Sequence, residues 1–331
     1  MAAPSGILAV GAATLIILIR GGAAMKAYLR RMKKNYQIYL FLLIPTIYII
    51  VFAYVPMAGI TLAFKKYNPN LGIWGSPWIG LKNFEKFFKS YMFERVLSNT
   101  IRLSVYQLVA GFPLPIIFAL MLNTVATGPF KKTVQTITYM PHFISTVVLV
   151  SMVIKIFNPL NGIYGRVGMA ILGQAPADLL ATPNSFVHMY VWSGVWQEFG
   201  WNSIIYIAAL AAVSPELHEA AQIDGASRLQ RVVHVDLPCI VPTAAIMLIL
   251  SFGRVMSIGF EKVYLMQNDL NLRMSEVIST YTYKEGLGSA IGGKTDYPYA
   301  TAIGLFNSLV NMTLVFAMNW LTRRLGETSL W

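Results

Sequence analysis

The chain has 331 residues, of which 56% are hydrophobic and only 12% are charged, and its mean hydropathy is +0.57. Water-soluble domains carry about twice this share of charged residues, so the composition argues against a soluble protein and predicts an integral membrane protein. The net charge of +12 is expected from basic residues that hold cytoplasmic loops in place. Outside the apolar stretches, Lys and Arg do not alternate with aromatic residues as they do in many nucleic-acid-binding surfaces. We therefore expect no nucleic-acid partner.

Residues 1–24 form an N-terminal extension that is either absent from the working protein or a further membrane span. The apolar stretch Ile7–Ile19 is short for a membrane span and no basic residue precedes it, unlike a secretory signal. Met25 is followed at once by a basic cluster, so we predict that the working protein begins there and that residues 25–331 form one transmembrane domain. If the stretch spans the membrane, it adds a seventh helix.

Six later stretches are long and apolar enough to cross a bilayer, which takes about 20 residues. Each is bounded by charged residues, proline or glycine. The predicted fold is therefore all-α, a polytopic bundle of six core spanning helices at 37–64, 97–122, 134–156, 186–213, 240–260 and 299–321.

The basic residues orient this bundle. They gather before the first span, in the turn after the second span and after the last span, which predicts that both termini and the loop 214–239 are cytoplasmic. The loops 65–96, 157–185 and 261–298 then lie outside. The loop 65–96 opposes this rule, because it carries six bases: Lys65, Lys66, Lys82, Lys86, Lys89 and Arg95.

The cytoplasmic loop 214–239 carries clear helix signals. Ser214 is a good N-cap with Pro215 at the first helical position, and Gly225 can adopt the left-handed backbone that ends a helix. Ser227 can cap a second helix that runs to Val235, before Pro238 begins the next span. We therefore expect a helix, a turn and a second helix that project into the cytoplasm.

The order of residues in this loop resembles the EAA motif of ABC importer permeases. The motif consists of a Glu-Ala-Ala triplet, a glycine, a branched aliphatic residue and a final Leu-Pro pair, here Glu219, Ala220, Ala221, Gly225, Val235, Leu237 and Pro238, with Asp224 beside the glycine. In that family the loop docks in a cleft of the ATPase subunit. The resemblance extends from about residue 36 to Trp331 and includes the segments 52–88, 260–287 and 299–311 and the terminal ETSLW.

These segments resemble the polysaccharide and oligosaccharide permease branch of the carbohydrate importers, which is similar to the maltose permeases. The resemblance implies a sugar substrate, a location in the bacterial plasma membrane and no catalysis by this chain. It also implies four partner chains: a second permease, two ATPase subunits that bind ATP and Mg²⁺, and an extracytoplasmic solute-binding protein. No cofactor is expected on this chain.

Polar residues within the spans are candidates for the sugar pathway. The fourth span mixes flat rings with hydrogen-bonding groups, which suits sugar faces and hydroxyls, and the sixth carries a polar stripe. Small and polar residues also join spanning helices to each other, and Arg254 can equally select acidic sugars or pair with Glu198. The candidates are Trp196, Gln197, Glu198, Trp201, Asn202, Tyr206, Arg254, Asn307 and Asn311.

Residues 288–295 read GSAIGGKT, which matches the phosphate-binding pattern of ATPases. No buried strand precedes it and the predicted topology places it outside the cell, so we interpret it as a flexible glycine turn.

A membrane-embedded glycan-processing enzyme and an ion-coupled secondary transporter are the alternatives for the whole chain. The four histidines are scattered without metal-ligand spacing, and the single Cys239 can form no internal disulfide.

Overall fold

The structure is a computed structural model that describes residues 33–288 and 295–324. The chain divides into two units after Ile60. The described part of the first unit begins with α2 (Tyr36–Ile49), which continues through the π-helix η1 (Ile50–Tyr54) into the 3₁₀-helix η2 (Val55–Phe64). The whole stretch Tyr36–Phe64 is long and apolar enough to cross a membrane, as predicted for the first span. None of the side chains of α2 is buried.

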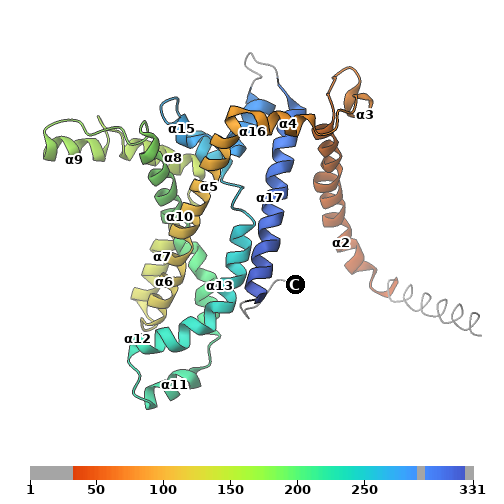
Figure 1. Cartoon of the computed structure of the whole chain (residues 1–331). Helices are drawn as coiled ribbons and strands as arrows, with labels where there is room; N and C mark the ends of the chain where they lie inside the picture. Colours follow the sequence, from red (N-terminus) through yellow and green to blue (C-terminus); the bar gives the residue numbers. More distant parts are fainter. Residues whose placement is uncertain (1–32, 289–294, 325–331) are drawn as a thin grey trace, which may run out of the picture. The chain divides into compact units, whose positions relative to one another are not determined.

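The second unit is a bundle of long helices around α10 (Pro183–Ala211). This helix contacts α5 (Tyr91–Gly111), α6 (Pro113–Asn123) and α13 (Leu237–Phe252), and α13 contacts α17 (Tyr297–Arg324). Figure 1 shows α17 beside α13. The largest core cluster joins α5, α10 and α14 (Phe260–Met266) through buried side chains that include Leu103, Phe186, Val191 and Val263.

The described helices confirm an all-α membrane fold. Four helical stretches are individually long and apolar enough to span a membrane, and two bent helix pairs raise this number to six if each pair is one span. The described residues contain a single isolated β-bridge, between Lys65 and Trp78, and no strand.

The third predicted span is bent rather than straight. It consists of α7 (Pro129–Tyr139), the short η3 (Met140–Phe143) and α8 (Thr146–Ile156), and the two halves meet at 99°. The break lies after Phe143, where Ile144 and Ser145 have extended backbone, and Ser145 caps the new helix by accepting a hydrogen bond from the Val148 amide. The α7 half lies against α10 at Gly200, where an added Cβ would come within 2.1 Å of the Thr138 carbonyl oxygen.

The helix predicted to end near Val235 continues into the fifth span. The segments α12 (Arg228–Arg231), η4 (Val232–Asp236) and α13 form one helical stretch, Arg228–Phe252. Pro238 does not break it, because the preceding π-helical segment shifts the backbone hydrogen bonds that proline would disrupt. Helix α13 then ends at Phe252, eight residues before the predicted end of this span at 260.

Short helices cover one end of the second unit. They are α4 (Lys82–Lys89), α14, α15 (Leu272–Ser275) and α16 (Ile278–Gly286), and α4 and α16 both pack against α17. Two further short helices are α3 (Gly72–Gly75) and α9 (Ile163–Leu172). Helix α11 (Pro215–Ile223) lies at the opposite end of the unit (Figure 1).

Candidate functional site

A cavity of about 380 Å³ lies inside the bundle, between α5, α6, α10 and α13. Four of the predicted pathway residues line it: Glu198, Asn202, Tyr206 and Arg254. The cavity is also lined by Ser251 and Ser257, which flank Arg254 in the sequence, and by Ser104 and Gln107, which the sequence did not single out. Ser104 and Gln107 are three residues apart on α5, and this helical spacing was the available signal for a polar face.

The cavity borders on the break in the fifth span. After α13 ends at Phe252, the chain is not helical until α14 begins at Phe260, and this interruption brings Arg254, Ser257 and Gly259 to the cavity wall. Irregular backbone at membrane depth is tolerated where it lines a cavity and its polar groups are satisfied. The helix of the fifth span is therefore interrupted beside Arg254, at the cavity wall.

Two side chains hold the broken segment in place. Asn311 on α17 accepts a hydrogen bond from the Met256 amide at 2.9 Å, and its Nδ2 donates to the Ser257 hydroxyl at 2.8 Å. Ser104 on α5 donates a hydrogen bond to the Val255 carbonyl oxygen. Asn311 therefore supports the cavity wall from behind, and it does not itself line the cavity.

Glu198 pairs with a histidine of the bent third span. Its Oε2 lies 3.0 Å from Nδ1 of His142, whose ring stacks on Trp201 with a centroid distance of 4.3 Å and an interplanar angle of 4°. Glu198 therefore pairs with His142 rather than with Arg254. Among the described carboxylates, none forms an ion pair with Arg254, which is exposed on the cavity wall, although Glu198 lines the same cavity.

The other predicted pathway residues lie away from this cavity. Gln197 is buried and donates to the Ile144 carbonyl oxygen at 2.8 Å, which supports the bend before α8. Trp196 is 43% exposed, and Asn307 on α17 has a buried Oδ1 with no hydrogen-bond partner. The residues that do not line the cavity are Trp196, Gln197, Trp201, Asn307 and Asn311.

The loop with the EAA motif folds locally as its sequence predicts. Ser214 accepts a hydrogen bond from the Glu216 amide and starts α11, and Gly225 ends it in the left-handed conformation with φ of +77°. Ser227 and Gln230 form a reciprocal capping box at the start of α12. Helix α11 leaves α10 at an angle of 71°.

The motif residues face outward. Glu219, Ala220, Asp224, Gly225, Leu237 and Pro238 are exposed and Ala221 is half-buried. The apolar side chains of Ile223 and Leu229 are 87% and 73% exposed on the same loop. Large apolar side chains exposed beside small residues are typical of a surface that binds a protein partner.

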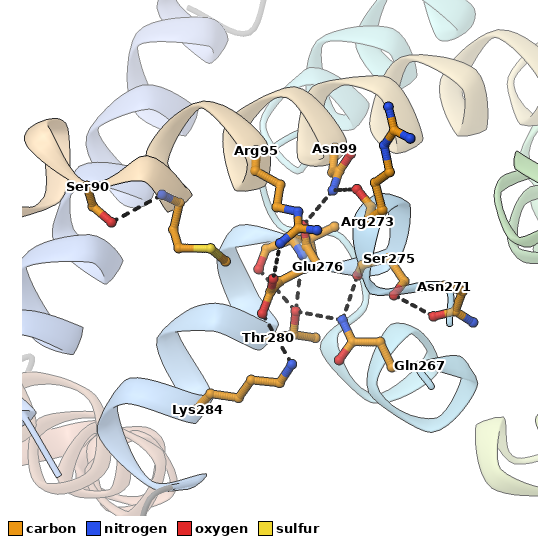
Figure 2. Close-up of polar contacts among 12 residues, drawn as sticks. Ser90, Arg95, Asn99, Gln267, Asn271, Arg273, Ser275, Glu276, Thr280 and Lys284 are labelled. Atoms are coloured by element: carbon orange, nitrogen blue, oxygen red, sulfur yellow. Dashed lines mark hydrogen bonds and ion pairs between the residues drawn. The ribbon is translucent and has the colours of Figure 1, made fainter. Parts of the chain in front are cut away.

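A buried polar cluster joins α5 to α15 and α16 at the opposite end of the unit (Figure 2). Glu276 is 7% exposed and lies 3.6 Å from Arg95 and 3.3 Å from Lys284. Asn99 on α5 donates to the backbone carbonyls of Arg273 and Glu276. This cluster fixes the segment that follows α14 against the second predicted span.

Comparison with known proteins identifies the chain. Residues 111–327, more than half of it, match the family described as the binding-protein-dependent transport system inner membrane component. The chain belongs to this family. It is a multi-pass permease of an ABC importer and a non-catalytic transport subunit, which decides against the membrane-embedded enzyme and the ion-coupled transporter.

Several relatives of this permease cover nearly all of it. Protein LplB of Bacillus subtilis (strain 168) is 37% identical over 92% of this chain and 94% of its own length. The polygalacturonan/rhamnogalacturonan transport system permease protein YteP of the same organism is 39% identical over 92% and 94%. These matches confirm the resemblance to the sugar importer permeases.

Two solved structures share the fold of the permease. A chain of a bacterial ABC transporter involved in the import of the acidic polysaccharide alginate is 38% identical, with a TM-score of 0.80 over 89% of this chain and 98% of that one. A chain of the bacterial alginate ABC transporter in complex with an alginate pentasaccharide-bound periplasmic protein is 36% identical, with a TM-score of 0.82 over 91% and 99%.

Three features singled out from the sequence fall wholly or largely outside the described residues. The extension 1–24 lies outside them, as do residues 289–294 of the GSAIGGKT segment and the terminal ETSLW. Within residues 33–288 and 295–324, no group of three or more His, Cys, Asp or Glu side chains is placed to hold a metal ion.

Proposed function

We propose that this permease pairs with a second permease chain to form an alternating-access pathway for an acidic oligosaccharide. The observation that carries the proposal is Arg254, a guanidinium on the cavity wall that forms no ion pair with a described carboxylate. An arginine binds a carboxylate through two parallel N–H···O bonds, which suits the uronic acid groups of an acidic sugar. Gln107, Asn202 and Tyr206 supply hydrogen-bonding groups for hydroxyls on the same wall.

The names of the relatives support an acidic substrate. YteP is named for polygalacturonan and rhamnogalacturonan, and the two similar structures belong to an importer of the acidic polysaccharide alginate. Galacturonan and alginate both carry a carboxylate on their sugar units, so a single cationic side chain in the pathway can bind either of them.

We propose further that the EAA loop docks on an ATPase subunit. Glu219 offers a carboxylate for a basic residue in the partner's cleft, and the small side chains of Ala220 and Ala221 allow α11 to lie close to the cleft floor. The exposed Ile223 and Leu229 supply apolar area to bury there. Two such ATPase subunits, one for each permease chain, would bind ATP and Mg²⁺, and an extracytoplasmic solute-binding protein would deliver the sugar at the other end.

We propose that both termini lie in the cytoplasm, because basic residues gather before the first span, after the second span and after the last span. Four of the six bases that opposed this orientation have partners: Lys65 donates to the Ile73 and Trp74 carbonyls, Lys86 pairs with Asp296, Lys89 with Glu85 and Arg95 with Glu276. The hydrogen bond from Lys89 lowers the pKa of the Glu85 carboxyl below its ordinary value. These contacts hold the bases in place locally, but acidic neighbours contribute little to the charge bias that sets topology, so the loop 65–96 still opposes the orientation.

A panel of sugars tests the substrate. The solute-binding protein that serves this permease is titrated with uronate-containing and neutral oligosaccharides of equal length. The transporter, reconstituted in vesicles with that protein, is then given each sugar with ATP on the ATPase side. We expect uptake of the acidic sugars only, and uptake of neutral sugars alone would overturn the proposal.

A further inference from the structure

One buried carboxylate joins three elements at the α11 end of the bundle. Asp236 is 2% exposed, and its Oδ1 lies 3.2 Å from Nε2 of His218 and 3.2 Å from Nδ2 of Asn123. His218 belongs to α11, Asn123 is the last residue of α6, and Asp236 is the last residue before α13. The contact therefore connects the EAA loop to the second and fifth spans at a single atom.

Apolar packing contributes little to the position of α11. None of its side chains is buried, although it carries Leu217 and Ile223. The side chain of His218 is only 27% exposed, and it reaches the buried Asp236. A hydrogen bond to a charged, buried group is stronger and more directional than one between exposed neutral groups, so this contact is the main described restraint on where α11 lies.

Asp236 contacts His218 although three basic residues lie nearby. Lys131, Arg228 and Arg231 line the same cavity of about 520 Å³ as His218 and Asp236. In the described residues the ion pair of Asp236 is nevertheless with His218, and Nε of Arg231 is buried there without a partner. The geometry of α11, rather than charge alone, therefore selects the partner of the carboxylate.

We propose that His218, Asp236 and Asn123 are positioning residues that tie α11 rigidly to α6 and α13, so that a movement of α11 reaches both spans together. The proposal rests on the proposed docking of an ATPase at the EAA loop. Without this link, α11 would move on its loop when the ATPase closes, and ATP would be hydrolysed without a matching change in the membrane helices.

The ratio of sugar imported to ATP hydrolysed tests the link. Both quantities are measured in the same vesicles that hold the complete transporter and the sugar-loaded binding protein. We expect His218→Ala and Asn123→Ala to lower the ratio about fivefold or more, the range of typical coupling between sites, while the ATPase subunits still co-purify. His218→Gln keeps a donor and is expected to retain most of the ratio.

His234→Ala is the matched control, because His234 is an exposed histidine of the same loop that contacts only the Gln230 carbonyl oxygen. Its ratio should equal that of the unmodified chain. The double variant His218→Ala/Asp236→Ala should be no worse than Asp236→Ala, since both changes remove one shared contact.

A distance measurement separates this role from a general loss of structure. Spin labels are placed at two exposed positions, Gln222 on α11 and Thr127 after α6, in a Cys239→Ala background. The distribution of label distances should be narrow in the unmodified chain and broad in His218→Ala. An unchanged ratio, or a distribution that stays narrow in His218→Ala, overturns the link.

Glu219→Lys distinguishes failure of the link from failure of the docking proposal. If Glu219→Lys abolishes uptake while the His218, Asp236 and Asn123 variants keep the normal ratio, only the link is wrong. If Glu219→Lys also leaves uptake and ATPase association unchanged, the docking proposal itself fails.

Discussion

Asn311 accepts a hydrogen bond from the backbone amide of Met256 at 2.9 Å, and this contact holds the interrupted part of the fifth span against α17. The Met256 side chain is 2% exposed, so its backbone amide has little access to an alternative partner in water. The shape of the cavity wall that presents Arg254 therefore depends on a residue that does not itself face the cavity.

Replacing Asn311 by leucine should disturb this wall. The Met256 amide and the Ser257 hydroxyl both lose their partner, and leaving a buried donor unsatisfied costs about 1–3 kcal/mol. We expect a lower thermal unfolding midpoint of the purified complex and reduced uptake. Thr313→Val is the control, because Thr313 donates only to the Leu309 carbonyl of its own helix; equal behaviour of the two variants would contradict the assigned role.

Replacing Arg254 by glutamine should lower uptake of acidic sugars. A hydrogen bond to a charged group contributes about 1.5–3 kcal/mol, so we expect a loss of about 10- to 100-fold in kcat/KM for transport. The affinity of the solute-binding protein for the sugar should not change, which isolated titrations check. Arg254→Lys keeps the positive charge but cannot form two parallel hydrogen bonds to a carboxylate. Its kcat/KM for transport should lie between that of the unmodified chain and that of Arg254→Gln. Normal uptake by Arg254→Gln would remove the basis for an acidic substrate.

Replacing Glu276 by glutamine should destabilise the end of the bundle that carries α15 and α16. The variant leaves Arg95 and Lys284 without their carboxylate at a position that is 7% exposed. The two cations left behind are each more than a third exposed, so water partly replaces the carboxylate and we expect a loss below the ~3–5 kcal/mol of a fully buried pair. The unfolding midpoint in detergent measures it.

Glu85→Gln is the control for that measurement. Glu85 pairs with Lys89 through side chains that are 59% and 75% exposed, and such surface pairs contribute little to stability because water screens them. If Glu85→Gln lowers the unfolding midpoint as much as Glu276→Gln does, the buried carboxylate contributes no more to stability than the exposed one, and the prediction is wrong.

Replacing Asn307 by leucine should leave uptake unchanged and the unfolding midpoint equal or higher. The Oδ1 of Asn307 is buried without a hydrogen-bond partner, and Asn307 does not line the cavity. An unsatisfied buried acceptor costs free energy that an apolar side chain of similar size does not. Loss of uptake at normal stability would instead assign Asn307 to the sugar pathway.

Local signals in the sequence predicted local structure well. The caps at Ser214 and Ser227 and the left-handed Gly225 follow from neighbouring residues alone, and the structure contains all three. The apolar stretches predicted the spans because burial in lipid demands length and composition rather than specific partners. Proline was less decisive: Pro141 lies within the helical stretch Pro129–Phe143, before the bend of the third span, and Pro238 lies in a continuous helix after a π-helical segment.

Contacts between distant residues could not be predicted from spacing. The pairs of Glu198 with His142 and of Asp236 with His218 join residues 56 and 18 positions apart in the sequence. Which polar residues line the cavity also depends on how the helices turn relative to each other, so Glu198 and Arg254 were identified while Ser104 and Gln107 were missed.

The central claim is that ATP hydrolysis on partner subunits, coupled at the EAA loop, drives an acidic oligosaccharide through this permease. The most direct test is accumulation of a labelled acidic oligosaccharide in vesicles that contain the whole transporter, its binding protein and ATP on the ATPase side. We predict accumulation with the unmodified chain and background levels with Glu219→Lys and with Gly225→Val, which strains the left-handed turn. Accumulation by both variants at the unmodified rate would contradict the claim.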